Sequence, residues 1–359
     1  MCDDPPVLNE QRAYPPRRLP IRQGIKIIFE LTNLCNFSCI HCLRSEEGEK
    51  RFIDPELIDK VLREAELYRQ VSNVSLTGGE PTVHPRFAEI VDLVARHGYP
   101  FSFVTNGWGF RRTFDAIAPV KGYVRAVSFS LDGATEEVHD YIRRRKGSFR
   151  QVMGAIALCR HHEVPVQINM TITRDNRHQL DEMALLASRL GCDALAYAHC
   201  QPTDDAVRAN LVMDADERLG VESDVAELQG IFKMKVYLAG DHAVDSPFFQ
   251  CSQLQMREFN VDYRGYLTAC CTLSNYRGGA PDTDVLADLN EVSLQEAHRA
   301  MISTFADLNR EKVARLGSTP ETPADRFMCS HCLLHYQKVP QLEEILAPRA
   351  AEPAEGGGR

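Results

Sequence analysis

The stretch LTNLCNFSCIHCLR, residues 31–44, decides how this sequence is interpreted. Cys35, Cys39 and Cys42 fall within it in the spacing Cys-x3-Cys-x2-Cys, and no fourth cysteine lies nearby. A structural zinc site usually takes four protein ligands, and His41, between two of the cysteines, is poorly placed to be the fourth. Thiolates also hold iron–sulfur clusters. The spacing therefore favours a cluster with one iron left open to a ligand that is not protein.

Composition indicates an ordinary globular protein with metal or redox chemistry. The chain has 359 residues, 44% of them hydrophobic and 25% charged, without a signal peptide or an apolar run of membrane-spanning length. We therefore expect a cytoplasmic protein with no membrane partner. The formal net charge of −9 argues against nucleic acid as a partner. Twelve cysteines in a reducing compartment indicate metal binding before disulfides.

Short β-branched runs alternate with amphipathic helical stretches from residue 24 to about residue 200, which predicts an α/β fold. The predicted strands cover residues 25–31, 73–77, 101–105, 124–131, 166–173 and 193–199. Alternation of this kind indicates parallel strands joined by right-handed crossovers, in an open sheet or an incomplete barrel. In both forms the chemistry lies where the strands end.

Polar clusters follow these strands in order. The three-cysteine loop follows the first strand, GGEP (78–81) the second, Asn106-Gly107 the third and Asp132-Gly133 the fourth. This combination resembles the radical S-adenosylmethionine (SAM) superfamily. The resemblance covers about residues 24–200 and implies a partial (β/α)6 barrel. It also implies a [4Fe–4S] cluster that binds SAM at its open iron and cleaves it to a 5′-deoxyadenosyl radical.

The resemblance implies a set of cofactor-binding residues. Cys35, Cys39 and Cys42 would hold the cluster that cleaves SAM. Gly78 and Gly79, which lack a Cβ, would let the backbone approach the ligand, and Glu80 would accept a hydrogen bond from the SAM ammonium. The other expected contacts are His41 with adenine, Ser130 with ribose, Arg143 with the SAM carboxylate and Asn106 with the cofactor, although Asn106 also suits a simple turn.

A second group of cysteines lies in the C-terminal part of the chain. Cys251, Cys270, Cys329 and Cys332 resemble, in their spacing, the SPASM extension of radical SAM maturases and more closely its shorter Twitch form. This resemblance implies one auxiliary [4Fe–4S] cluster, and a four-cysteine zinc site is the alternative. Because adjacent strand residues face opposite sides, only one of Cys270 and Cys271 should be a ligand, and the spacing favours Cys270.

The expected organisation has four parts. A proline-rich N-terminal extension (1–23) precedes the radical SAM partial barrel (24–235). A small α+β Twitch-like domain (236–340) follows, with a β-hairpin over 259–271 and a short helix over 293–305. The region after residue 200 begins as a loop, and residues 341–359 are expected to be a disordered tail.

The resemblance implies an enzyme that matures a ribosomal peptide by crosslinking, thioether formation or epimerisation, with the auxiliary cluster transferring electrons. A Twitch-type dehydrogenase of a cyclitol, sugar or other small molecule is the alternative, and an electron carrier is a weaker one. Cys200 would donate a hydrogen atom in an epimerase. The implied partners are a flavodoxin- or ferredoxin-type reductant and, because only about 24 residues precede the barrel, a separate leader-peptide-binding protein.

Overall fold

A computed structural model provides the structure of the 359-residue chain. It describes Tyr14, Pro15, Arg17 and residues 24–44, 48–68, 71–246, 248–319 and 321–348. The predicted N-terminal extension therefore lies mostly outside the described residues. Within the described ranges, no helix has both the length and the apolar character needed to cross a membrane.

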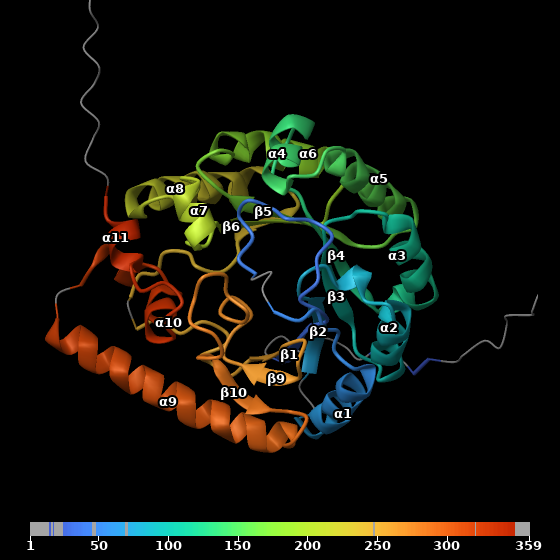
Figure 1. The fold of residues 1–359 in the computed structure, drawn as a ribbon. Helices are drawn as coiled ribbons and strands as arrows, with labels where there is room; N and C mark the ends of the chain where they lie inside the picture. The colour runs from blue at the N-terminus through green and yellow to red at the C-terminus, as the bar shows by residue number, and fades with distance from the viewer. Residues whose placement is uncertain are drawn as a thin grey trace, which may run out of the picture.

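A curved parallel sheet forms the centre of the molecule (Figure 1). Seven strands follow one another in chain order, each parallel to the next. They are β1 (Ile25–Glu30), β2 (Val71–Thr77), β3 (Phe101–Thr105), β4 (Val124–Ser130), β5 (Val166–Ile172), β6 (Ala194–His199) and β7 (Lys235–Leu238). The six predicted strands and the predicted α/β barrel are confirmed. The strand β7, in a stretch (233–240) whose sequence also predicts a strand, continues the sheet in parallel.

Helices surround this sheet on its outer side in Figure 1. They are α1 (Pro55–Ala65), α2 (Phe87–Arg96), α3 (Phe110–Ile117), α4 (Glu136–Arg143), α5 (Ser148–His161), α6 (Leu180–Arg189) and α8 (Ala215–Ile231). The short helix α7 (Asp204–Arg208) lies closer to the centre of the molecule than α8 in this view. In α1, Asp54 caps the N-terminus and Pro55 occupies the first turn, where a proline lacks no hydrogen bond. The buried face of α1 includes Leu57, Ile58 and Val61, which belong to the main hydrophobic core.

The alternation of side chains along each strand separates this core from the interior of the barrel. On β1, Ile27 and Phe29 are fully buried in the core between sheet and helices. Glu30, the next residue, is equally buried but makes polar contacts, with Asn260 and Ser274. The strand therefore packs one face against the helices and directs a carboxylate to the other face.

The C-terminal strands continue the same sheet. The strand β8 (Glu258–Val261) lies parallel to β1, and β9 (Tyr266–Thr268) and β10 (Val285–Asp288) follow in antiparallel order. The predicted hairpin is confirmed, and Gly265 in its turn has a φ of +94°. The strand β8 covers the edge of β1 that an isolated barrel segment would leave unpaired, and the division at residue 236 stays a prediction.

Several elements differ from the predictions. The helix expected over 293–305 is α9 (Leu294–Ser318), which lies beside β9 and β10 in Figure 1 and continues past residue 305 on mostly polar residues. The expected loop after residue 200 contains α7. The expected tail contains α11 (Leu342–Leu346), which follows α10 (Ser330–His335) and is ordered because Leu342 and Leu346 are buried. The disordered tail is therefore wrong for residues 341–348, and the rest of it lies outside the described residues.

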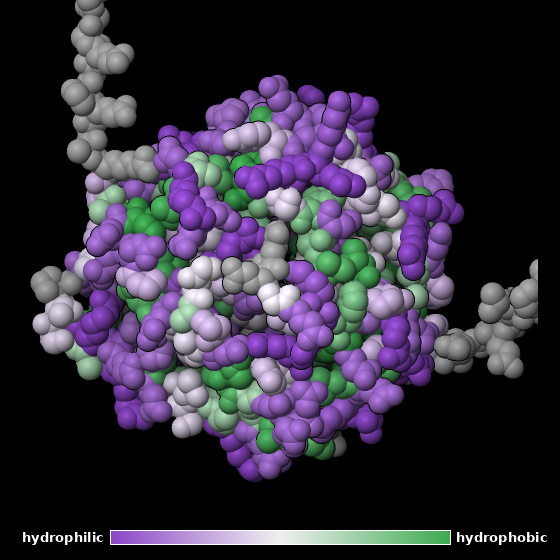
Figure 2. All heavy atoms as spheres, in the orientation of Figure 1, coloured by the Kyte–Doolittle hydropathy of each residue, from purple (hydrophilic) through white to green (hydrophobic). Residues whose placement is uncertain are grey.

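Hydrophilic side chains dominate the face shown in Figure 2, with apolar side chains in small separate groups. This view has the orientation of Figure 1. Such a surface agrees with the charged fraction of 25% in the sequence.

Candidate active site

The loops after the parallel strands enclose a cavity of about 310 Å³. The predicted residues that line it are Cys35, Cys39, His41, Cys42, Gly78, Gly79, Glu80, Asn106, Ser130 and Arg143. The structure thus brings together every predicted cluster-binding and SAM-binding residue of the barrel. They meet because the carboxyl ends of parallel strands lie at the same edge of the sheet.

The GGE segment is fixed to the cysteine loop through the backbone. The Gly79 N–H donates to Thr32 O at 2.7 Å, and the Glu80 N–H donates to Leu34 O at 2.9 Å. A Cβ on Gly78 would lie 2.4 Å from Thr32 O, and one on Gly79 would lie 2.3 Å from Leu34 O. The close approach that requires glycine is therefore to the cysteine loop, whereas the sequence analysis expected it toward the ligand.

Glu80 is a buried carboxylate with most of its acceptor capacity used. Its Oε1 accepts from the Thr82 N–H at 3.2 Å and from the hydroxyls of Thr82 and Thr105 at 2.7 and 2.9 Å. Its Oε2 accepts from the Asn106 N–H at 2.7 Å. Burial raises the pKa of Glu80, and these hydrogen bonds oppose that effect. Only Oε2 keeps room for another donor, which is compatible with an ammonium group in the cavity.

Asp132 is the residue that sequence analysis missed. It is fully buried, and its Oδ2 lies 2.7 Å from His41 Nε2 and 2.6 Å from Arg143 Nε. Its Oδ1 accepts from the Thr171 N–H at 2.9 Å. Burial alone would raise the pKa of Asp132, but Arg143 and then His41 hold it well below its usual range. The signal was available, because Asp132 belongs to the quoted motif after the fourth strand, from which only Ser130 was selected.

Arg143 connects this carboxylate to the cysteine loop. Its side chain is almost completely buried, and one terminal nitrogen lies 3.7 Å from Cys39 Sγ. Burial alone would lower the pKa of Arg143, but the charge of Asp132, followed by that of the Cys39 thiolate, raises it. A guanidinium has five N–H donors, so Arg143 retains donors that can reach a ligand carboxylate.

Asn106 has a structural role beside the cavity. Its amide nitrogen donates to Asn36 Oδ1 at 2.8 Å, and its own Oδ1 accepts from the Trp108 N–H at 3.0 Å. It therefore connects the loop after β3 to the cysteine loop. These two bonds match the turn that the sequence analysis offered as the alternative for this residue.

The three cysteines present their thiols to the cavity in a form that suits a metal cluster. Burial raises the pKa of Cys35 to about 12 and also raises the pKa of Cys39. A thiol of this kind stays protonated until a metal displaces the proton. The positive charge of the metal then balances the negative charge of the thiolate. The donor set therefore fits a cluster held by three thiolates from one loop.

Cys200 lies behind the cavity wall. It is 2% exposed and packs in a small apolar cluster with Ile40, Ile142 and Leu211. The adjacent His199 and Gln201 line the cavity, whereas Cys200 does not. This position does not support hydrogen-atom donation, and the suggested role of Cys200 stays an untested prediction.

A second cavity of about 510 Å³ adjoins the first, with which it shares Ala239, Gly240 and Thr272. Its lining includes the four cysteines of the second group and Cys271. In neither cavity, nor elsewhere among the residues that the structure describes, do three His, Cys, Asp or Glu side chains converge as they would on a single metal ion. The cysteines are instead distributed around the cavity.

Cys270 and Cys271 have different surroundings. A hydrogen bond with Cys271, together with burial, raises the pKa of Cys270, and the next groups that act on it are Cys329 and Cys251. The same hydrogen bond lowers the pKa of Cys271, on which Lys26, Glu258 and Arg44 also act. Cys270 is therefore the member of the pair that interacts with the other cysteines of its group, whereas Cys271 interacts with charged side chains of β1, of β8 and of the end of the first cysteine loop.

Comparison with known proteins relates this geometry to a family. Residues 29–187, less than half of the chain, match the Radical SAM superfamily. This region is similar to a radical SAM domain. The family implies a [4Fe–4S] cluster and SAM, for which the first cavity provides fitting residues.

Curated relatives match about half of the chain. The mycofactocin maturase MftC of Mycobacterium tuberculosis (strain CDC 1551 / Oshkosh) is 42% identical over 202 residues, covering 54% of this chain and 50% of the relative. The subtilosin biosynthesis protein AlbA of Bacillus subtilis is 33% identical over 173 residues, covering 47% of this chain and 38% of AlbA. The chain thus spans at most about half the length of these two relatives.

Solved structures agree with the fold. Streptococcus suis SuiB bound to its precursor peptide SuiA superposes with a TM-score of 0.65 at 11% identity, over 87% of this chain and 70% of SuiB. The protein anSMEcpe, with bound AdoMet and the Cp18Cys peptide, gives a TM-score of 0.61 at 16% identity, over 82% and 84% of the two chains.

Proposed function

We propose that this protein is a radical SAM enzyme that modifies a ribosomal peptide by crosslinking, thioether formation or epimerisation. The observation that carries the proposal is the pair of adjoining cysteine-lined cavities, one of them in the region that matches the Radical SAM superfamily. A substrate at their junction would lie between a site of radical formation and a site able to exchange an electron. The peptide assignment rests on the named functions of MftC and AlbA.

Residues of the first cavity would contact different parts of the cluster and of SAM. A cluster bound there would supply the electron for reductive cleavage of SAM, the chemistry that removes a hydrogen atom from the substrate. Cys35, Cys39 and Cys42 would hold that cluster, and Glu80 would accept from the SAM ammonium. Arg143, oriented by Asp132, would donate to the SAM carboxylate. His41, which Asp132 also orients, would contact the adenine, and Ser130 the ribose.

Two side chains that line the first cavity have a hydrogen-bond acceptor without a partner among the described residues. Gln201 donates its amide nitrogen to Asp241 at 3.2 Å, and its Oε1 is buried without a hydrogen-bond partner among the described residues. His199 is bonded through Nε2 to Glu222 at 2.9 Å, and its Nδ1 is buried and equally unpartnered there. Both residues line the cavity. Such acceptors match a substrate that presents N–H groups, as a peptide does.

The second cavity is proposed to hold an auxiliary [4Fe–4S] cluster on Cys251, Cys270, Cys329 and Cys332. A cluster ligated by four thiolates has no open iron, so its role would be electron transfer. A flavodoxin- or ferredoxin-type protein would reduce the first cluster. Dehydrogenation of a cyclitol or sugar is the second candidate function, because hydroxyl groups would satisfy the same acceptors.

The test is the iron and sulfide content after anaerobic reconstitution, with 5′-deoxyadenosine as the product measured. The wild type should hold about eight irons, and a Cys35/Cys39/Cys42→Ala variant about four, with no SAM cleavage. A wild type with about four irons, none of which remain in the variant, would refute the auxiliary cluster. Failure of reduced wild-type protein to cleave SAM would refute the enzyme and leave an electron carrier.

A further inference from the structure

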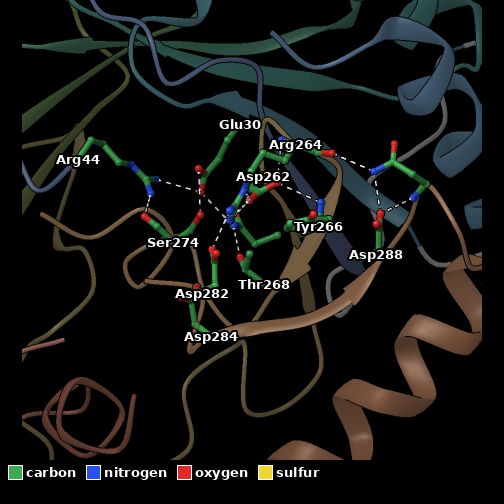
Figure 3. A network of polar contacts seen from close by, with 12 residues as sticks. Glu30, Arg44, Asp262, Arg264, Tyr266, Thr268, Ser274, Asp282, Asp284 and Asp288 are labelled. Carbon is green, nitrogen blue, oxygen red and sulfur yellow. Dashed lines mark hydrogen bonds and ion pairs between the residues drawn. The ribbon is translucent and has the colours of Figure 1, made fainter. Parts of the chain in front are cut away.

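The side chain of Arg44 lies between the two cysteine sites. Arg44 follows Cys42 by two residues and lines the first cavity. One terminal nitrogen lies 3.1 Å from Glu30 Oε1, and the other donates to the Ser274 carbonyl oxygen. The Ser274 N–H in turn donates to Cys270 O at 3.0 Å. Figure 3 shows the guanidinium directed at both partners.

Glu30 is held in place from several sides. It is 1% exposed at the end of β1, and its Oε1 accepts from Asn260 at 3.0 Å while its Oε2 accepts from Ser274 Oγ at 3.1 Å (Figure 3). The carboxylate and the Arg44 guanidinium therefore form a buried pair. Charges in such surroundings act over longer distances than charges at the surface, because solvent screens them less.

The guanidinium is linked by geometry to both groups of cysteines. Arg44 lies two residues after Cys42 and lines the cavity of the first group. The Ser274 carbonyl oxygen that it binds belongs to the turn that begins at Cys270, a cysteine of the second group. One cation thus lies close to segments of two sites that are far apart in the sequence.

Backbone contacts hold the two segments together around Arg44. Arg44 and Tyr276 form an isolated antiparallel β-bridge. The Arg277 N–H donates to Leu43 O at 2.8 Å, and Arg277 Nε donates to Arg44 O at 3.0 Å. The end of the first cysteine loop and the segment after Cys270 therefore form one unit, and the guanidinium has little freedom to move away from either site.

We propose that Arg44 is a positioning residue shared by the two cysteine sites, and that its buried charge, balanced by Glu30, sets the reduction potentials of both clusters together. The inference rests on the proposed function, since each cavity must hold a cluster. Adding an electron makes a cluster more negative, so a nearby cation stabilises the reduced form and raises the potential. Loss of Arg44 should lower both potentials, and loss of the Glu30 charge should raise both.

The test is a redox titration of the reconstituted protein, followed by electron paramagnetic resonance of each cluster. Arg44→Gln should shift both potentials to more negative values, Glu30→Gln should shift both to less negative values, and Arg44→Lys should stay close to wild type. Arg277→Gln removes the hydrogen bond from Arg277 Nε to Arg44 O but keeps the charge of Arg44, so it should leave both reduction potentials unchanged. Potential shifts of opposite sign in Arg44→Gln and Glu30→Gln would not arise if the two residues had only a structural role.

The outcomes separate this inference from the proposed function. Two clusters with unchanged potentials in Arg44→Gln and Glu30→Gln would overturn the inference and leave the proposed function intact. A shift in only one cluster would overturn the shared role. A wild type with a single cluster would refute the auxiliary site, and with it the shared role of Arg44. If Arg44→Gln fails to assemble, the upward shift expected in Glu30→Gln decides the matter alone.

Discussion

The two cysteine sites are assembled in different ways. The first takes its three cysteines from one loop, so its geometry follows from local sequence and needs only the strand ends to complete the cavity. The second collects Cys251, Cys270, Cys329 and Cys332 from separate segments, which approach one another only after the C-terminal strands join the sheet. A motif can therefore define the first site, whereas tertiary structure must define the second.

The largest expected effect tests which cysteines belong to the second site. Cys270→Ala should lose the auxiliary cluster, about four of eight irons, because the Cys270 thiol faces Cys329 and Cys251. The adjacent Cys271→Ala should keep all of them, because Cys271 faces Lys26 and Arg44. Iron analysis after reconstitution measures both. The reverse result would identify Cys271 as the ligand.

Removal of one of two buried carboxylates at the first cavity should separate cofactor binding from stability. Asp132→Asn leaves Arg143 buried without its counter-charge, and Asp241→Asn does the same to Arg218, 2.9 Å away. Each should lower the free energy of unfolding by about 3–5 kcal/mol, the usual cost of breaking a buried pair. Denaturant titration measures this change. Only Asp132→Asn should also weaken SAM binding to the reconstituted protein.

Equal SAM affinity in the two variants would contradict the assignment of Arg143 to the cofactor. Loss of SAM binding in Asp241→Asn would instead assign the far end of the cavity to SAM. The iron content of each variant provides the control, because both should keep two clusters.

The first site should also make the protein sensitive to acid. Burial, with Arg143 second, lowers the pKa of His139 to about 4, and its Nδ1 accepts from the Asp132 N–H at 3.1 Å. The folded state therefore favours the neutral ring, and its stability is complete above the unfolded pKa of about 6.5. As the pH falls from about 6.5 to about 4, we expect a loss of about 3 kcal/mol.

Denaturant titrations at several pH values measure this loss. In His139→Gln the stability should depend less on pH over the same interval, because the titrating ring is absent. An unchanged dependence in the variant would show that other groups cause the acid sensitivity.

The smallest effect is expected at Cys200. Because its thiol packs in an apolar cluster outside the cavity, Cys200→Ala should cost about 1 kcal/mol of stability. It should leave the rate of 5′-deoxyadenosine formation within about two-fold of wild type, as a residue outside the cavity. Unfolding and product analysis measure the two quantities. A loss of product turnover with intact SAM cleavage would restore the hydrogen-donor role.

The parts of the structure that could be predicted from the sequence are those whose residue patterns lie within one short segment. The strands, the GGE segment and the three-cysteine loop follow from periodicity and motif, and all the predicted SAM-site residues line one cavity. Asp132 was missed because its importance depends on two partners distant in sequence. The length of α9 and the order of α11 depend on packing against other segments, which local composition does not encode.

The position of β1 in the sheet affects how the protein is made. Its two neighbours are β2, which follows soon after it, and β8, which begins only at Glu258. During synthesis, β1 to β7 can pair in order while one edge of β1 waits for the last third of the chain. The three-cysteine loop extends from that strand, so we expect its cysteines to be more accessible to iron and sulfide before the C-terminal segment joins the edge than afterwards.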